Sequence, residues 1–228
     1  MKQPASFFIL LFATVLFLSC STNSKAQEVQ IGKQIWASKN LNVSKFRNGD
    51  SIPLISCHGD WIEAGKKKKP ACCFYKFDNA NEFKYGKLYN WFAVIDSRGL
   101  APLGWKIPSY ADTKELTDYL GGESIALRKI KSTNGWTDVI NYEAIVAPNF
   151  EGPFKEYGNG TNESGFNALP GGFCNMLGES KFSGNISYWW TTIEGIRFEA
   201  SFSSGFFVNV WNLKSLRRHG YYIRCIKD

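Results

Sequence analysis

The sequence is poor in the residues that metal and thiol chemistry require. Its 228 residues include only two histidines, His58 and His219, and no Cys-x-x-Cys pair. Zinc sites are built mainly from cysteine and histidine at short spacings, so the sequence indicates no zinc site. A cysteine nucleophile needs a base positioned beside it, and none is indicated either. We therefore expect no cofactor.

Neither sign of charge is in large excess. Lysine and arginine number 27 against 20 aspartate and glutamate residues, for a formal net charge of +7. Four of the lysines are consecutive at 66–69, but Gly65 precedes them and Pro70 follows, which is typical of a solvated loop. We therefore expect no nucleic-acid partner.

Only one long apolar run is present. It covers residues 5–18 and follows Lys2. A run of about 14 residues is shorter than a helix needs to cross a ~30 Å hydrocarbon core, and this pattern is typical of a secretory signal peptide. Since no second run follows, we expect no membrane-spanning segment in the mature chain.

The letters FLSC at 17–20 end the apolar run and resemble the lipobox of bacterial lipoproteins. In a lipobox the cysteine is acylated and becomes the new N-terminus. The resemblance predicts a signal peptide over 1–19, a lipid anchor at Cys20 and a polar tether over 20–28. The alternative is ordinary cleavage after Ala26, which would give a secreted protein.

The remaining cysteines are disulfide candidates, because exported proteins fold in oxidising compartments. They are Cys57, Cys72, Cys73, Cys174 and Cys225. Their number is odd, so at least one is free or pairs between chains. Adjacent residues of a strand point to opposite faces, so only one of Cys72 and Cys73 should reach Cys57.

Apolar spacing predicts two main helices. The first has an apolar stripe at Leu88, Trp91, Phe92 and Ile95 and should begin near Gly86. The second has an N-cap and capping box at Ser109 and Asp112, a buried face, and a glycine stop at 121–122. Its buried face is predicted to be Leu116, Tyr119 and Leu120. A shorter third helix is predicted over 124–131.

Short strands account for most of the rest. A hairpin is predicted over 29–36 with its turn at Gly32 and Lys33. Further strands are predicted at 72–77, 172–175, 188–192, 197–203, 206–212 and 221–227. The fourth of these, 197–203, alternates apolar and polar residues, as a half-solvated strand should. The segment 150–165 is predicted to be an exposed loop.

Helices followed by an antiparallel meander predict one α+β domain over 29–228.

Seven motifs in a fixed order carry a family resemblance. They are YGKLYNWFAV (85–94), GWKIPS (104–109), LTDYLGG (116–122), NESGF (162–166), ALPGGF (168–173), YWWTT (188–192) and IRCIKD (223–228). With these motifs the chain resembles the Fibrobacter succinogenes major paralogous domain family of bacterial envelope proteins. The resemblance implies a lipoprotein or secreted protein of Bacteroidota or related bacteria. It also implies a C-type-lectin-like domain, with two main helices packed on twisted antiparallel sheets and long loops.

The chain departs from this family at two positions. Ala101 stands where many members have a cysteine, which the resemblance implies would pair with the cysteine matching Cys225. Without that partner, Cys225 is expected to be unpaired or joined to Cys174. Cys72 replaces a common tryptophan and is expected to form an added bridge with Cys57.

Candidate ligand-binding residues lie in the aromatic motifs and the loops. Trp189, Trp190 and Trp211 are candidates for a sugar-stacking platform. The alternative is that they are core residues, because the adjacent Trp189 and Trp190 point to opposite faces of a strand and at least one of them must be buried. Loop oxygens of Asn159, Asn162, Glu163 and Glu194 are possible calcium ligands, but the carboxylates are sparse and no Glu-Pro-Asn motif is present. Of these we select Trp190, Glu194, Trp211, Asn162 and Glu163 as the candidate ligand-binding residues.

No catalytic set stands out from the sequence. A glycosidase needs two carboxylates at one cleft, and no spacing selects a pair. The formylglycine-generating enzymes share the implied fold but need two cysteines near the C-terminus, where this chain has only Cys225. We expect a non-catalytic cell-envelope lipoprotein that binds a glycan or a surface protein. The alternative is a structural or accessory component of a surface assembly.

Overall fold

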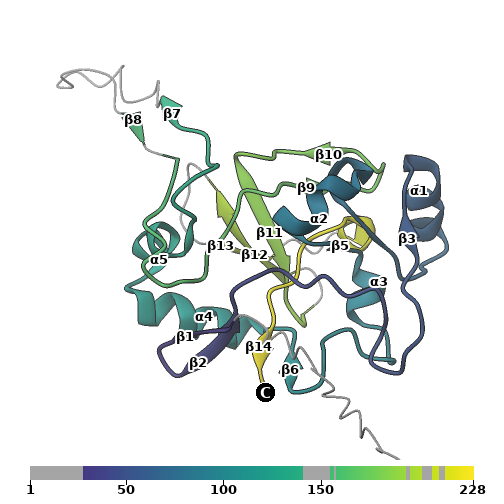
Figure 1. The fold of residues 1–228 in the computed structure, drawn as a ribbon, viewed down its shortest axis with the longest axis horizontal. Helices are drawn as coiled ribbons and strands as arrows, with labels where there is room; N and C mark the ends of the chain where they lie inside the picture. The colour runs from purple at the N-terminus through teal and green to yellow at the C-terminus, as the bar shows by residue number, and fades with distance from the viewer. Residues whose placement is uncertain (1–27, 141–154, 157, 194–195, 202–206, 211–213) are drawn as a thin grey trace, which may run out of the picture.

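The two ends of the domain meet in one antiparallel sheet. In the computed structural model, which describes residues 28–140, 155–156, 158–193, 196–201, 207–210 and 214–228, β1 (Glu28–Ile31) and β2 (Gln34–Ala37) form the predicted hairpin. The C-terminal β14 (Ile226–Lys227) lies between β2 and β6 (Trp105–Lys106), which gives the order β1-β2-β14-β6 (Figure 1). An ion pair of 2.7 Å joins Lys227 Nζ to Glu28 Oε2. The first and last strands of the domain therefore lie in the same sheet and are joined by an ion pair between their side chains.

A second sheet runs through the middle of the molecule. It consists of β11 (Ile186–Trp190), β12 (Ile196–Ser201) and β13 (Phe207–Val210), paired antiparallel in that order. Neighbouring residues of β11 point to opposite faces, so Trp189 and Trp190 enter different core clusters. The first core cluster includes Trp36, Phe166, Trp189 and Phe198, and the second includes Trp91, Trp190 and Tyr221. Both tryptophans are thus core residues.

Strand β12 is buried on both faces, which corrects the prediction of a half-solvated strand. Phe198 and Ala200 are fully buried, as the alternation predicts, but Arg197 and Glu199 on the other face are only 9% and 7% exposed. The Arg197 guanidinium lies 4.2 Å from the centre of the Tyr188 ring, and its Nη1 donates to the Tyr221 hydroxyl at 3.3 Å. Aromatic rings from neighbouring segments therefore cover the face that the sequence pattern assigns to solvent.

The second predicted helix is confirmed as α4 (Tyr110–Leu120). The Ser109 hydroxyl accepts from the Asp112 backbone N–H while the Asp112 carboxylate accepts from the Ser109 backbone N–H, as in a capping box. Leu116 and Leu120 are buried, but Tyr119 is 65% exposed and does not belong to the buried face. The third helix is confirmed as α5 (Glu123–Ile130). Figure 1 shows α4 and α5 side by side next to the β1–β2 hairpin.

The helix predicted from Gly86 is wrong in its first part. Residues Leu88–Tyr89 form β5, which pairs with β4 (Cys72–Cys73), and only Trp91–Val94 is helical, as α3. The Asn90 side chain separates the two elements, because its Oδ1 accepts from the Ala93 backbone N–H at 3.0 Å and thereby caps the helix. Strand pairing therefore takes the residues that the apolar stripe assigns to a first helical turn.

The remaining elements are short. The helices are α1 (His58–Lys66), α2 (Glu82–Tyr85), η1 (Tyr75–Phe77), η2 (Asn79–Asn81) and η4 (Lys214–Arg218). The strands are β3 (Leu54–Ile55), β7 (Val139–Ile140), β8 (Lys155–Glu156), β9 (Phe173–Cys174) and β10 (Ser180–Lys181). The strand predicted at 72–77 thus stops at Cys73, and that predicted at 221–227 is reduced to β14. The domain is a mixed α+β structure of small sheets and short helices.

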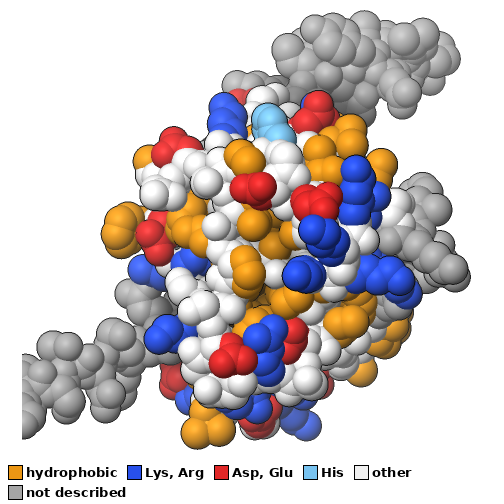
Figure 2. All heavy atoms as spheres, turned by 90° about the vertical axis from the view of Figure 1, so that its right-hand side faces the viewer, with side chains coloured by type: hydrophobic (Ala, Val, Ile, Leu, Met, Phe, Trp, Pro, Cys, Tyr) orange, Lys and Arg blue, Asp and Glu red, His pale blue; other side chains and the backbone are white. Residues whose placement is uncertain are grey.

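The lysine run at 66–69 lies in solvent, as predicted. All four side chains are exposed at the end of α1 and just after it, and Lys67 pairs with Glu63 at 2.8 Å. On the face that carries α1, acidic and basic side chains are interspersed with apolar ones (Figure 2). Over the described ranges, the structure contains no helix with the length and apolar character needed to cross a bilayer.

The environment of His219 makes stability depend on pH. Burial, reinforced by the charges of Arg197 and Arg218, lowers the pKa of His219 from 6.5 to about 4. The unfolded chain therefore binds a proton between these pH values that the folded chain does not. The contribution of His219 to the free energy of unfolding is therefore complete above about pH 6.5 and is lost as the pH falls towards 4.

We expect the unfolding free energy to fall by up to about 3 kcal/mol between pH 7 and pH 4 through this residue. Urea unfolding at several pH values measures it. His219→Gln should flatten the pH dependence, whereas His58→Gln, a change at an exposed histidine, should leave it as in the wild type. An unchanged slope in His219→Gln would contradict the assignment.

Candidate functional site

A groove lies between the β1–β2 turn and α4. We call it the Tyr119 groove, a hollow of about 680 Å³. The residues that define it are Gly32, Lys33, Tyr110, Lys114, Asp118 and Tyr119. A smaller hollow of about 250 Å³ continues on the other side of Tyr119 and is lined by Gln30, Lys129, Glu163 and Ser164. Tyr119 therefore lies between two adjoining depressions.

The Tyr119 ring is held against a glycine turn. A Cβ at Gly32 would lie 2.9 Å from the ring, and Gly32 has a φ of +62°, so only glycine permits both the turn and the close approach. Packing on this turn limits ring motion while the side chain remains 65% exposed. Tyr110, at the start of the same helix, is 40% exposed. The groove thus presents two aromatic side chains on a well-supported helix.

Charged groups of both signs surround these rings. Lys33, Lys114 and Lys129 balance Glu115, Asp118 and Glu163. Lys114 Nζ lies 2.6 Å from Asp118 Oδ2, in an exposed i,i+4 pair. Exposed ring faces, flanked by hydrogen-bond donors and acceptors without net charge, suit an uncharged polyhydroxy ligand better than a strongly charged one.

Of the three predicted loop residues that the structure describes, only Glu163 lines a hollow next to Tyr119, the smaller one beside the groove. Asn162 has a φ of +52°, and its Oδ1 accepts from the Asn167 backbone N–H at 2.7 Å. That side chain holds the 162–167 turn together and is occupied within the protein. Asn159 likewise accepts through Oδ1 from the Trp136 backbone N–H at 3.0 Å.

The placement of Trp190 corrects its selection as a ligand-binding residue. The side chain is 1% exposed, and its Nε1 donates to the Tyr89 carbonyl at 2.7 Å. Its ring packs on Trp91 and Tyr221, with centroid distances of 5.2 and 4.4 Å, so no face remains for a ligand. Glu194, Trp211 and Cys20 lie outside the described residues.

Metal chemistry receives no support from the described part of the chain. No group of three or more His, Cys, Asp or Glu side chains there could hold a metal ion. Glu115 and Asp118 do line one hollow, but both are exposed and Asp118 is ion-paired with Lys114.

Sequence reasoning missed both groove tyrosines. Tyr119 follows the buried Leu116 by three positions, and this spacing placed it on the apolar face. The exposure of the ring depends on Gly32, which lies 87 positions earlier and which no local pattern links to it. The sequence predicts that Gly32 forms the hairpin turn, but it does not show that the same glycine lies beneath the Tyr119 ring.

Comparison with known proteins identifies the family. The family model of the Fibrobacter succinogenes major domain matches residues 29–227. The chain belongs to this family. No curated protein and no solved structure matches the chain. The match covers the whole region over which the ordered motifs resemble the family, from β1 to β14.

The cysteines of this Fibrobacter succinogenes major domain are arranged differently from the predicted pairs. All five described cysteines are free thiols. Cys57 is exposed, whereas the other four are buried. Cys73 and Cys174 lie in the first core cluster, and Cys72 and Cys225 lie in the second. The predicted Cys57–Cys72 bridge is absent. Of the two alternatives for Cys225, the structure has it unpaired, since Cys174 lies in the other cluster.

Cys73 and Cys174 are the two thiols brought together. They come from β4 and β9, and both lie in the first core cluster, where the Cys174 thiol donates to the Asn175 carbonyl at 3.6 Å. Burial, with the nearby Cys174, raises the pKa of the Cys73 thiol well above its usual value. The folded protein therefore keeps this thiol protonated and slow to react.

We expect refolding in a glutathione buffer, which supplies the oxidant, to close a Cys73–Cys174 disulfide. Closing the long loop between Cys73 and Cys174 should raise the free energy of unfolding by roughly 2–4 kcal/mol. Peptide mapping identifies the bond, and urea unfolding with and without reductant measures its effect. Cys73→Ser and Cys174→Ser should each abolish it, whereas Cys57→Ser should not. A different bond in the refolded wild type would contradict this pairing.

Proposed function

We propose that this protein is a non-catalytic, lipid-anchored domain of the bacterial cell envelope that binds glycan through the Tyr119 groove. The observation that carries the proposal is the exposed Tyr119 ring, supported from beneath by Gly32 and bordered by charged side chains of both signs. We also propose that the domain has a C-type-lectin-like fold. Its mixed α+β structure, with the first and last strands of the domain in one sheet, supports that finer assignment.

Two properties of the groove favour a sugar. A pyranose has an apolar C–H face that packs on an aromatic ring and excludes water from both surfaces. Its hydroxyl groups, around the edge of the ring, both donate and accept hydrogen bonds. Lys114 and Asp118 supply these two functions on consecutive turns of α4, next to Tyr119. A hollow of about 680 Å³ has room for more than one sugar unit.

Binding is favoured over hydrolysis. The groove carboxylates are exposed and project from one face of a single helix, whereas a glycosidase places its two carboxylates on opposite sides of the scissile bond. Rings and charged groups in this arrangement hold a ligand without supplying a general acid.

We expect Tyr119→Ala to weaken glycan binding about tenfold, because the stacking surface is removed. A glycan array, screened with soluble protein beginning at Val29, identifies the ligand, and titration calorimetry then compares the variants. Tyr119→Phe keeps the ring and should bind within about twofold of the wild type. Circular dichroism confirms that each variant is folded.

Three results would count against this function. The first is no binding on the array, with or without calcium. The second is equal affinity for Tyr119→Ala and the wild type. The third is release of shorter sugars from the bound glycan, which would indicate an enzyme. A stable stoichiometric partner from envelope extracts, without glycan binding, would favour the alternative of a surface-assembly component.

The membrane anchor is tested separately. We expect Cys20→Ser to move the protein from the membrane fraction to the soluble fraction, because no acyl chain is then attached. Fractionation followed by mass spectrometry of the N-terminal peptide measures both effects. A Cys20→Ser protein that stays in the membrane would contradict lipidation, and a wild-type N-terminus at Gln27 would favour cleavage after Ala26.

A further inference from the structure

Arg224 is a buried cation with no acidic partner among the residues that the structure describes. Its side chain is 2% exposed and directly precedes Cys225 near the C-terminus. Its guanidinium donates to the carbonyls of Ala37 and Phe166, at 3.2 and 2.6 Å, and twice to Asn40 Oδ1, at 3.1 and 2.9 Å. All these acceptors are neutral. Buried charges are normally paired, because removing an ion from water is costly.

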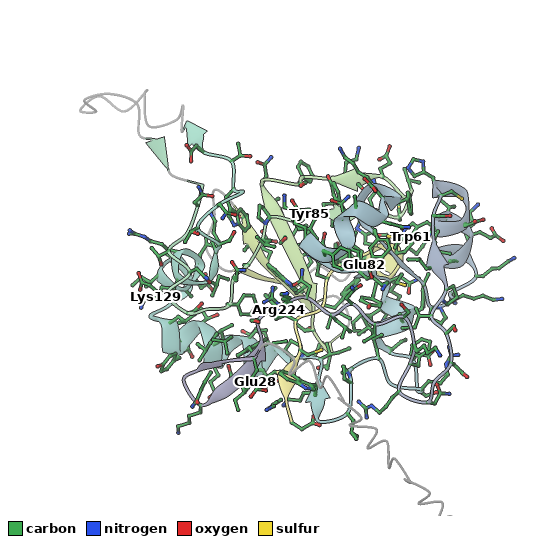
Figure 3. All side chains as sticks on the ribbon, in the orientation of Figure 1. Glu28, Trp61, Glu82, Tyr85, Lys129 and Arg224 are labelled. Atoms are coloured by element: carbon green, nitrogen blue, oxygen red, sulfur yellow. The ribbon has the colours of Figure 1, made fainter. Side chains whose placement is uncertain are left out.

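A pocket of about 360 Å³ is lined in part by Arg224. Its lining also includes Lys39, Asn40, Asn42, Glu82 and Lys84. We call it the Arg224 pocket. Figure 3 shows Arg224 near the centre of the molecule, below Glu82 and Tyr85 of α2. The Arg224 pocket shares no lining residue with the Tyr119 groove or with the smaller hollow beside it. The two sites are therefore separate.

The charge of the Arg224 pocket is positive. Its one carboxylate, on Glu82, lies 3.6 Å from Lys87 Nζ and accepts from Asn42 Nδ2 at 3.0 Å, so it is already partnered. Lys39 and Lys84 are exposed at the pocket, and neither forms an ion pair within the described residues. Arg224, Lys39 and Lys84 thus leave an excess of positive charge around one hollow.

The hydrogen bonds of Arg224 leave it able to bind a further acceptor. A guanidinium has five N–H groups, and the four bonds to Ala37, Phe166 and Asn40 use four of them. The remaining N–H is on Nη2. An anionic oxygen placed there would gain a charge-assisted bond and would also neutralise a cation in a region of low dielectric.

We propose that the Arg224 pocket binds a small ligand through an anionic group, a carboxylate or a phosphate. The buried guanidinium holds the anion at the base of the pocket, and Lys39 and Lys84 attract it at the entrance. The volume accommodates a ligand about the size of one sugar unit that carries the charge. This site is independent of the proposed glycan groove, so either can fail without the other.

The test uses full-length protein in a non-ionic detergent, at constant ionic strength. Thermal unfolding is followed during titration with glucuronate, glucose 6-phosphate, inorganic phosphate and, as the neutral control, glucose. We expect a saturable rise in Tm with at least one of the anions and none with glucose. Stabilisation by glucuronate alone assigns a carboxylate ligand, and stabilisation by both phosphates assigns a phosphate ligand.

Variants then localise the effect. The double variant K39A/K84A should bind the anion at least about fivefold more weakly, because it loses both exposed cations. The matched control K33A/K129A removes one lysine from the Tyr119 groove and one from the smaller hollow beside it, and should bind as the wild type does. The Arg224 Nε–H resonance should also shift on titration of wild-type protein labelled with 15N at arginine, a readout that does not require a variant at the buried position.

Three outcomes would overturn the proposal. One is the absence of saturable stabilisation by every anion. Another is equal anion affinity in K39A/K84A and the wild type. The third is an Arg224 resonance that does not respond at saturation. In each case Arg224 would be only a structural brace between the N-terminal segment and the 162–167 turn.

Discussion

The hydrogen bonds of Asn40 connect segments that are far apart in the sequence and come together around the Arg224 pocket. Its Oδ1 accepts from Trp189 Nε1 at 2.8 Å and from two nitrogens of Arg224, while its Nδ2 donates to the Tyr85 carbonyl at 2.8 Å. One side chain thereby links β11, the C-terminal segment and α2 to the loop that follows β2. Such a network is costly to leave half satisfied, because each buried polar group would lose its partner in a region without water. The small sheets are too short to define the fold alone, and this network fixes their relative positions.

The two proposed sites use this framework in different ways. The Tyr119 groove lies on regular elements, a hairpin turn and a capped helix, and its surface is electrically balanced. The Arg224 pocket lies directly on the network, and its positive charge results from an arginine that the fold buries without an acid. A domain with both sites would distinguish ligands by shape at one and by charge at the other. Rigid support from the core is what lets such exposed side chains bind with little loss of entropy.

Sequence reasoning succeeded where the signal was local. The capping box at Ser109 and the hairpin turn at Gly32 were predicted correctly, because neighbouring residues satisfy each other's hydrogen bonds. Sequence reasoning failed where a segment far away in the sequence pairs with residues whose local pattern predicts another structure. The stripe from Leu88 to Ile95 has helical spacing, yet β4 pairs with Leu88 and Tyr89 and converts them to a strand. Of the selected ligand-binding residues, Trp190 proved to be core and Glu163 reached a groove, since exposure depends on what covers a residue.

The sequence by itself determined the family, the mixed α+β class and the ends of the capped helix, because ordered motifs and short-range hydrogen bonding are written in consecutive residues. It also established that Trp189 and Trp190 lie on opposite faces of a strand. Only the tertiary structure decided that both of those faces are buried, that Cys73 meets Cys174, and that Tyr119 is exposed above Gly32. It alone placed Arg224 beside a pocket without an acidic partner. Each of these facts depends on which distant segment comes to lie against a given face, and no local pattern carries that information.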